Sequence, residues 1–363
     1  MASPQCGISV RKPRILSCKE IRPLKKTPVA RYILVCLLVF CLCAPVPAQQ
    51  TVALVGCGSV IPGPLYGVWA DAYTSHNPHV QVKYLSLGSS EGIKQITAGS
   101  ADFGAGEIPI SDDEMKTTGK RIHHLPLFLS VVVPIYNVPG VSQRLRFSGR
   151  VLADIFGGDI KRWNHPDLVK LNPGAQLPNL GITTMHREPG KGTTFLFTDF
   201  LSKSSPAFRA KIGTDGSPNW PSGVTTQGAQ TMVKQVSDTP GAIGYAELNV
   251  AKAGSVAVGL VQNSSGAFVE ASPESAAAAC PPSLKGDMRM SLTNRPGANV
   301  YPITGFSYMF VPAEGVSSSR SEALRGFLKF VFTDGQSMIA AHGHLPLPPR
   351  IVSSVLSTLN LDN

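Results

Sequence analysis

Cysteine is almost absent from the chain beyond its first 48 residues. Of the seven cysteines, only Cys57 and Cys280 lie after that point. Neither a Cys-x-x-Cys nor a His-x-x-x-His spacing occurs, so the common patterns of zinc sites are missing. We therefore expect no metal site and no cofactor. The sequence leaves open whether the two cysteines form a disulfide or remain two buried thiols.

Charged residues are also few, at 15% of the 363 residues. The formal net charge is +10, but the first 48 residues hold eight bases and one acid, a net of +7, which leaves about +3 for the rest. A nucleic-acid-binding domain needs a basic stripe on its folded surface. The excess positive charge lies elsewhere, so we expect no nucleic-acid partner.

No apolar run is long enough to cross a membrane. The run from Tyr32 to Ala44 has 13 residues, whereas a spanning helix needs about 20. It follows a basic region and precedes small residues, which is typical of a secretory signal peptide. We predict cleavage after Ala48 and a periplasmic or secreted mature protein. Lipidation of Cys43 is the alternative, disfavoured because the bulky Leu42 precedes it.

Short β-rich runs alternate with segments of helical spacing in the remainder of the chain. Runs at 51–55, 80–87 and 127–136 read as strands, and helices are expected from Pro64 and over 320–333. Strand–turn–helix units in series predict an α/β fold with a largely parallel sheet and flanking helices. Residues 263–290, rich in Ser, Ala and Pro, read as a surface excursion.

Three turns share one physical design, in which a strand ends, a Gly/Ser turn follows and a helix begins. They lie at 56–61, 88–92 and 187–193. Free N–H groups and the positive end of the helix dipole make such a helix start suitable for an anion. Ser89, Thr193 and Thr194 add hydroxyl donors, and Arg187 adds a planar fork that fits an oxyanion. The turns predict an oxyanion site without identifying the anion.

Several longer strings resemble the phosphate-binding proteins of bacterial ABC importers. They occur in the order of that family, from about residue 51 to 310: GSSEGIKQI (88–96), DFGAGE (102–107), DIFGGDIKRW (154–163), LNPG (171–174), residues 187–195, WP (220–221), PGAIGY (240–245) and YPIT (301–304).

The resemblance implies a two-lobed clamshell, the type II periplasmic binding protein fold, which closes around the anion. It places lobe 1 at 49–133 plus 304–363 and lobe 2 at 134–303, after the signal peptide at 1–48. The chain would cross between the lobes near 131–136 and 302–307.

The resemblance also implies a function and a set of ligands. The function is capture of inorganic phosphate for membrane permease subunits of an ABC transporter, by a monomer that is not an enzyme. A different oxyanion, such as sulfate or a phosphorylated or phosphonate compound, is the alternative. The implied ligands are Ser59, Val60 and Ile61 through their backbone N–H groups, and Ser89, Glu107, Arg187, Lys191, Gly192 and Thr193.

Three departures from the family pattern fall within this set. Val60-Ile61 replaces a Thr before an aromatic residue, so one hydroxyl donor is lost. Glu107 replaces Asp and is one methylene longer. Lys191 replaces Ser, and the sequence leaves open whether its ammonium group points into the site or to solvent. A buried carboxylate could accept the proton of hydrogen phosphate and would repel fully ionised sulfate.

A serine hydrolase is the rival class. GSSEG (88–92) matches the Gly-x-Ser-x-Gly nucleophile elbow and is expected between a strand and a helix. Ser90 would then be the nucleophile, with a downstream His such as His342 or His344. No second motif supports this interpretation.

Overall fold

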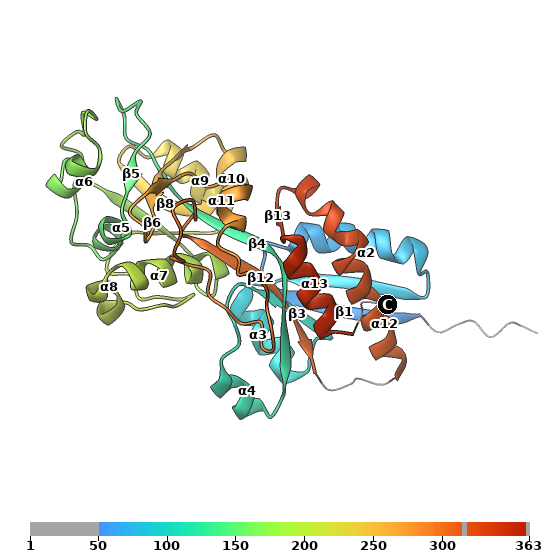
Figure 1. The fold of residues 1–363 in the computed structure, drawn as a ribbon. Helices are drawn as coiled ribbons and strands as arrows, with labels where there is room; N and C mark the ends of the chain where they lie inside the picture. The colour runs from blue at the N-terminus through green and yellow to red at the C-terminus, as the bar shows by residue number, and fades with distance from the viewer. Residues whose placement is uncertain (1–50, 314–317, 361–363) are drawn as a thin grey trace, which may run out of the picture. The chain divides into compact units, whose positions relative to one another are not determined.

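The computed structural model describes residues 51–313 and 318–360 (Figure 1). The predicted signal peptide at 1–48 and Cys43 therefore lie outside the described residues. The helices in the described ranges include none that is both long and apolar enough to cross a membrane.

The first strand group is a three-stranded parallel arrangement in the order β2-β1-β3. Each strand is followed by a helix, as the strand–turn–helix units predict, and helix α2 packs on β2 while α3 packs on β3. The members are β1 (Val52–Gly58), α2 (Gly63–His76), β2 (Val80–Ser86), α3 (Ser89–Ala98) and β3 (Phe103–Gly106).

The second strand group has the order β8-β6-β7, and both of its strand pairs are parallel. Helix α9 packs on β8, and α7 is packed between α5, α8 and β8. The members are β6 (Thr183–Arg187), α7 (Gly192–Ser204), α8 (Pro206–Lys211), β7 (Val224–Thr226), α9 (Ala229–Asp238), β8 (Ala242–Glu247) and α10 (Leu248–Ala253).

Two long strands connect the groups. β4 (Ile122–Tyr136) pairs with β12 (Thr304–Pro312) as far as Val131, and from Val132 it pairs with β8. β12 also pairs with β3. All these central pairings are antiparallel, because the chain leaves the first group along β4 and returns along β12. The parallel pairs thus lie in the outer strands, and the centre is antiparallel.

The remaining helices and strands complete the described chain (Figure 1). They are α4 (Asp112–Thr118), β5 (Arg146–Phe147), α5 (Gly149–Phe156), α6 (Pro166–Leu171), β9 (Ala257–Val258), β10 (Leu260–Gln262), β11 (Phe268–Val269), α11 (Pro273–Ala277), α12 (Ser318–Phe332), η1 (Asp334–Met338), η2 (Ala340–His342), β13 (Leu345–Pro346) and α13 (Pro349–Thr358).

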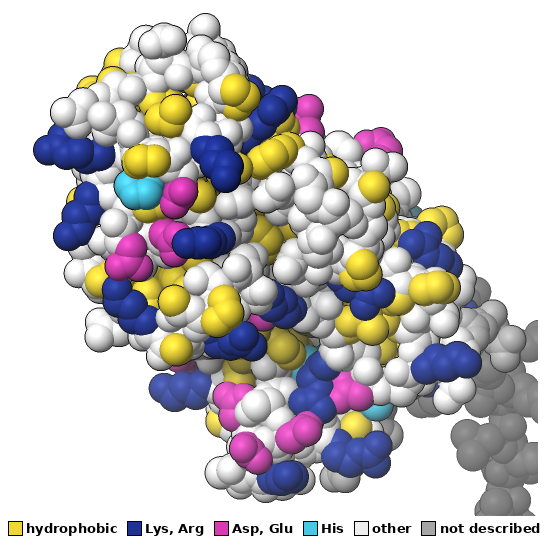
Figure 2. Space-filling model, turned by 60° about the vertical axis from the view of Figure 1, so that its left-hand side comes forward, with side chains coloured by type: hydrophobic (Ala, Val, Ile, Leu, Met, Phe, Trp, Pro, Cys, Tyr) yellow, Lys and Arg dark blue, Asp and Glu magenta, His cyan; other side chains and the backbone are white. Residues whose placement is uncertain are grey.

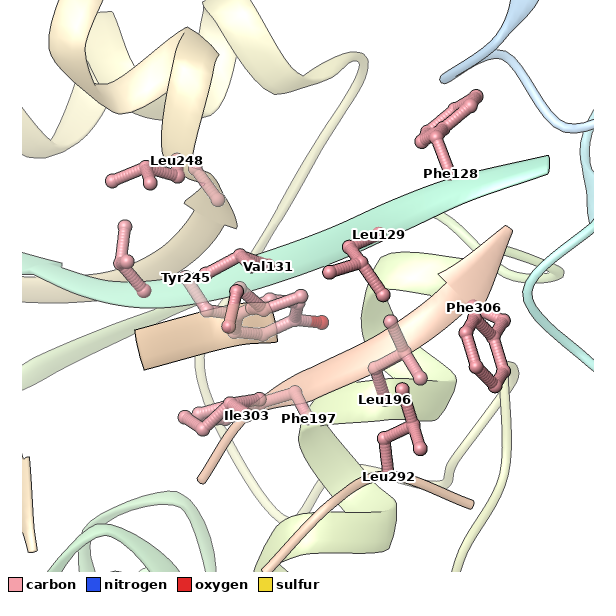
Figure 3. Close-up of a cluster of buried hydrophobic side chains, with 14 of the residues drawn as sticks. Phe128, Leu129, Val131, Leu196, Phe197, Tyr245, Leu248, Leu292, Ile303 and Phe306 are labelled. Atoms are coloured by element: carbon pink, nitrogen blue, oxygen red, sulfur yellow. The ribbon is translucent and has the colours of Figure 1, made fainter. Parts of the chain in front are cut away.

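The core is continuous where β4 and β12 run side by side. Figure 3 shows Leu129 of β4 close to Leu196 of α7, with Phe306 of β12 nearby, while Val131 of β4 lies beside Tyr245 of β8. The segment before β12 adds Leu292 to this cluster.

The stretch 263–290, expected to be a surface excursion, also contributes to the core. Ala276, Cys280, Leu284 and Met288 are buried. The expectation was wrong for these residues. Their small and apolar side chains pack against other parts of the fold, although the local composition resembles that of a loop.

The structure shows how charged side chains are distributed on the surface and whether the two cysteines are paired. On the face seen in Figure 2, Lys and Arg side chains are interspersed with Asp and Glu and form no stripe.

Cys57 and Cys280 are both buried and free. Burial raises the pKa of each thiol to about 11, so both are neutral, and the disulfide left open by the sequence is not formed.

Candidate anion-binding site

Strand ends bring the candidate residues together. Ser59 follows β1 and Glu107 follows β3, and because these strands are parallel their carboxyl ends lie at one edge. Arg187 ends β6 and Glu247 ends β8, which are also parallel neighbours. Each group therefore presents its polar residues from one edge.

A buried carboxylate, Glu107, is the centre of the site. It is 1% exposed and accepts hydrogen bonds from three serine hydroxyls. Ser59 Oγ lies 2.8 Å and Ser89 Oγ 3.1 Å from its Oε2, and Ser307 Oγ lies 2.8 Å from its Oε1. Burial raises the pKa of Glu107 and outweighs the hydroxyl donors, which lower it.

The start of helix α7 approaches this carboxylate from the second strand group. A Cβ placed on Gly192 would lie 2.7 Å from Cβ and 2.9 Å from Cδ of Glu107, and closer still to Oε2. Only glycine permits this approach. Glu107 thereby occupies the amino end of α7, where the helix dipole favours a negative charge.

Arg187 lies beside two further carboxylates. It is 3% exposed, and its Nε donates to Glu188 Oε2 at 3.1 Å. Its Nη1 is 3.7 Å from Glu247 Oε1 and has no hydrogen-bond partner. Burial lowers the pKa of Arg187, but Glu247 and Glu188 more than offset this, so the pKa is raised and the guanidinium stays charged.

Glu247 is a second buried acid of the site. It is 5% exposed, accepts a hydrogen bond from the Thr193 hydroxyl, and its Oε2 has no partner. A buried oxygen without a donor is costly. Arg187 Nη1 and Glu247 Oε2 are therefore a donor and an acceptor with unused hydrogen-bonding capacity near each other.

Lys191 points inward, toward the other turns, which answers the question left by the sequence. Its Nζ is 3.5 Å from Glu188 Oε1, and a Cβ on Gly88 would lie 3.2 Å from that nitrogen. Ser90 N also donates to Gly190 O at 3.3 Å. The turn before α3 and the turn before α7 are thus in contact.

The first turn offers fewer backbone donors than expected. Ser59 N donates to Ala105 O at 2.8 Å, and Ile61 N donates to Ser59 Oγ at 3.3 Å. The N–H of Ser59 is thus engaged in the sheet, and its hydroxyl is the group directed at Glu107. No hydrogen bond of the Val60 N–H is seen among the described contacts.

Sequence reasoning missed Glu188, Glu247 and Ser307. Glu188 lies inside the string 187–195, Glu247 two residues after PGAIGY, and Ser307 three residues after YPIT. Proximity to these strings was the available signal. It could not indicate which side chains turn toward the site.

Both buried carboxylates line cavities. One cavity of about 470 Å³ is lined by Glu107, Phe195, Arg289 and others. Another of about 540 Å³ is lined by Glu247, Ile61, Ser130 and others. Of the other candidate ligands, Ile61 lines the second cavity, whereas Ser59, Arg187 and Thr193 line neither of the two.

The geometry does not assemble a serine hydrolase. Ser90 Oγ makes no hydrogen bond to a histidine within the described ranges, and its N–H is engaged with Gly190. His344, offered as a partner, instead packs on Phe128 with ring centroids 4.5 Å apart.

Comparison with known proteins gives consistent matches over most of the chain. A family model described as a PBP superfamily domain matches residues 45–335. The phosphate-binding protein PstS of Haemophilus influenzae is 36% identical over 318 residues, covering 86% of this chain and 93% of the relative. The PstS of Xylella fastidiosa strain Temecula1 is 34% identical and covers 86% of each.

Solved structures share the fold. A phosphate-binding protein from Stenotrophomonas maltophilia matches with a TM-score of 0.63 at 18% identity, covering 85% of this chain and 94% of that one. A phosphate ABC transporter substrate-binding protein from Clostridium perfringens, with bound phosphate, gives a TM-score of 0.59 at 19% identity, with coverages of 82% and 100%. Such neighbours are two-lobed, so the expected two-lobed α/β fold is confirmed.

Proposed function

Because this chain belongs to the PstS family of phosphate-binding proteins in the PBP superfamily, we propose that it captures inorganic phosphate outside the cytoplasm for an ABC importer. It is a solute-binding protein and not an enzyme. The same proposal includes two further points. Membrane permease subunits receive the phosphate-loaded protein, and the protein acts as a monomer.

The observation that carries the proposal is the environment of Arg187. A buried guanidinium with an unused Nη1 lies 3.7 Å from Glu247 Oε1, the oxygen that also accepts a hydrogen bond from the Thr193 hydroxyl in the first turn of α7. A desolvated guanidinium forms short, strong hydrogen bonds with an oxyanion. Ser59 and Ser89 supply further donors from the opposite strand group.

The buried acids favour phosphate over sulfate. Hydrogen phosphate carries a proton that Glu107 or Glu247 can accept, whereas sulfate at neutral pH carries none. Two carboxylates that are 1% and 5% exposed would repel sulfate, which has no proton to share with them. Anion choice therefore depends on protonation rather than on size.

The clamshell is the mechanism we propose. Lobe 1 comprises 49–133 and 304–363, and lobe 2 comprises 134–303, with β4 and β12 as the crossings. Val131 of β4 pairs with Thr304 of β12, and at Val132 the partner of β4 becomes β8. Phosphate between the turns would favour the closed form, which the permease would recognise.

The test is calorimetric titration of the chain from Gln49, stripped of ligand, with phosphate and then sulfate at pH 7. We expect phosphate to bind and sulfate to give no heat. In Arg187→Ala, phosphate affinity should fall by at least about 100-fold, since a desolvated charge-assisted contact is lost. Sulfate binding as tight as phosphate binding refutes the assigned anion, and unchanged affinity in the variant refutes the site.

A further inference from the structure

Three of the candidate ligand residues, Ser59, Ser89 and Gly192, converge on a single oxygen atom, Glu107 Oε2. The hydroxyls of Ser59 and Ser89 donate to it at 2.8 and 3.1 Å, and the Cα of Gly192 packs against it at the start of α7. Lys191 is the N-cap residue of the same helix. Hydroxyl donors and the amino end of a helix would also stabilise an oxygen of a bound oxyanion.

The whole Glu107 side chain, from Cβ to Oε2, lies against the start of α7. Glu107 follows β3 of the first strand group, yet its carboxylate reaches the first residue of α7 in the second group. Ser307 of β12 holds its other oxygen at 2.8 Å. The carboxylate is thus anchored at both oxygens and is 1% exposed.

We infer that the Glu107 carboxylate is a tethered internal competitor that occupies the oxyanion position and lowers the affinity for phosphate. The inference rests on the proposed function, because it concerns the same site. An incoming phosphate displaces the Glu107 carboxylate from the hydroxyls of Ser59 and Ser89 and accepts their hydrogen bonds instead. Glu107 then accepts hydrogen bonds from other groups or receives the proton of the anion.

Shortening the Glu107 side chain tests whether its carboxylate competes with phosphate, while keeping an acid that can accept the proton of the anion. In Glu107→Asp an acidic acceptor remains, but the carboxylate carbon moves to the place of the Glu107 Cγ, so its oxygens no longer coincide with the Oε2 position that the Ser59 and Ser89 hydroxyls contact. We expect phosphate to bind about tenfold more tightly to Glu107→Asp than to the wild type, with sulfate still rejected. The matched control is Glu270→Asp, the same substitution at an exposed ion pair with Arg144, which should leave the affinity unchanged.

A second variant gives an independent readout. Glu107→Ala leaves the donors of Ser59, Ser89 and Ser307 without their carboxylate. Free acetate should then occupy the emptied position and compete with phosphate in this variant, while acetate at the same concentration should not affect the wild type. Circular dichroism spectra of each variant report whether it has folded.

The outcomes distinguish the two proposals. Phosphate binding by the wild type with equal or weaker binding by Glu107→Asp overturns the competitor role, because a direct ligand of optimal length would lose affinity on shortening. Absence of acetate competition in folded Glu107→Ala also overturns it. If neither the wild type nor Glu107→Asp binds phosphate, the proposed function itself fails.

Discussion

Arg187 and its acidic neighbours show how single residues set the charge of the site. Glu188 and Glu247 flank the guanidinium, and Lys191 lies 3.5 Å from Glu188. The guanidinium is thereby compensated while buried, which avoids the cost of an unpaired charge.

Glu188 gives the clearest pH prediction. Burial raises its pKa, but Arg187 lowers it more, so the pKa is about 2, against an ordinary value of 4.5. A depressed carboxyl pKa stabilises the fold above the unfolded-state pKa, and this contribution is lost as pH falls through about 2. Glu188→Gln should therefore lower the unfolding free energy at pH 7 by roughly 1–2 kcal/mol, allowing for screening.

Thermal denaturation in phosphate-free buffer at pH 7 and near pH 2 measures this effect. The difference between Glu188→Gln and the wild type should be much smaller at the lower pH. Glu107→Gln serves as the contrast. Burial raises the pKa of Glu107, so the ionised Glu107 side chain lowers the unfolding free energy at neutral pH. This loss disappears as the pH falls and Glu107 becomes protonated. If Glu188→Gln is destabilised by the same amount at both pH values, the low pKa assigned to Glu188 is contradicted.

Helix α3 shows how an element positions a ligand residue. Gly92 lies against the backbone of the first strand group, where an added Cβ would be 2.5 Å from Gly58 Cα and 3.2 Å from Ala105 O. This close packing holds Ser89, at the start of the same helix, within 3.1 Å of Glu107. The distance between helix and sheet thus determines a contact of the site.

Substitution of this glycine should separate the helix from the sheet. Gly92→Ala forces a backbone clash that a flexible side chain cannot relieve, and we expect a loss of about 2 kcal/mol in unfolding free energy together with weaker phosphate binding. The control is Gly67→Ala in α2, where an added Cβ has nothing within 4 Å. That substitution should stabilise by up to about 1 kcal/mol. Urea denaturation measures both, and equal effects would contradict this explanation.

At the scale of the described molecule, binding and folding are linked through the two strand groups. The proposed ligands come from both groups, so phosphate bound as proposed would contact residues at the ends of β1 and β6 and at the starts of α3 and α7 together. Contacts of the turns, such as Ser90 N to Gly190 O at 3.3 Å, would be made in the closed form. Phosphate should thus stabilise the closed arrangement and the fold at once.

Free phosphate at 100 times the dissociation constant should add about 2.7 kcal/mol to the unfolding free energy. Scanning calorimetry with increasing phosphate should show a rising Tm, and Arg187→Ala should show little rise at the same concentrations. Small-angle scattering should report a more compact particle when phosphate saturates the protein. An unchanged scattering curve at saturation would contradict lobe closure.

Much of the fold could be predicted from local patterns. The strand at 80–87 and the helix from Pro64 correspond to β2 and α2, because alternation and helical spacing are properties of a short segment. The antiparallel centre could not be predicted this way. It depends on β12 pairing with β4, and strands so far apart in sequence carry no local record of their partner.

The sequence by itself determined the strand–turn–helix units and the glycine-rich turns between them, including the turn that carries Arg187. Only the tertiary structure decided what surrounds Glu107. Ser307 lies 200 residues away along the chain and Gly192 belongs to the other strand group. Their convergence follows from strand pairing and helix packing, which bring distant segments within hydrogen-bond distance and which no single segment encodes.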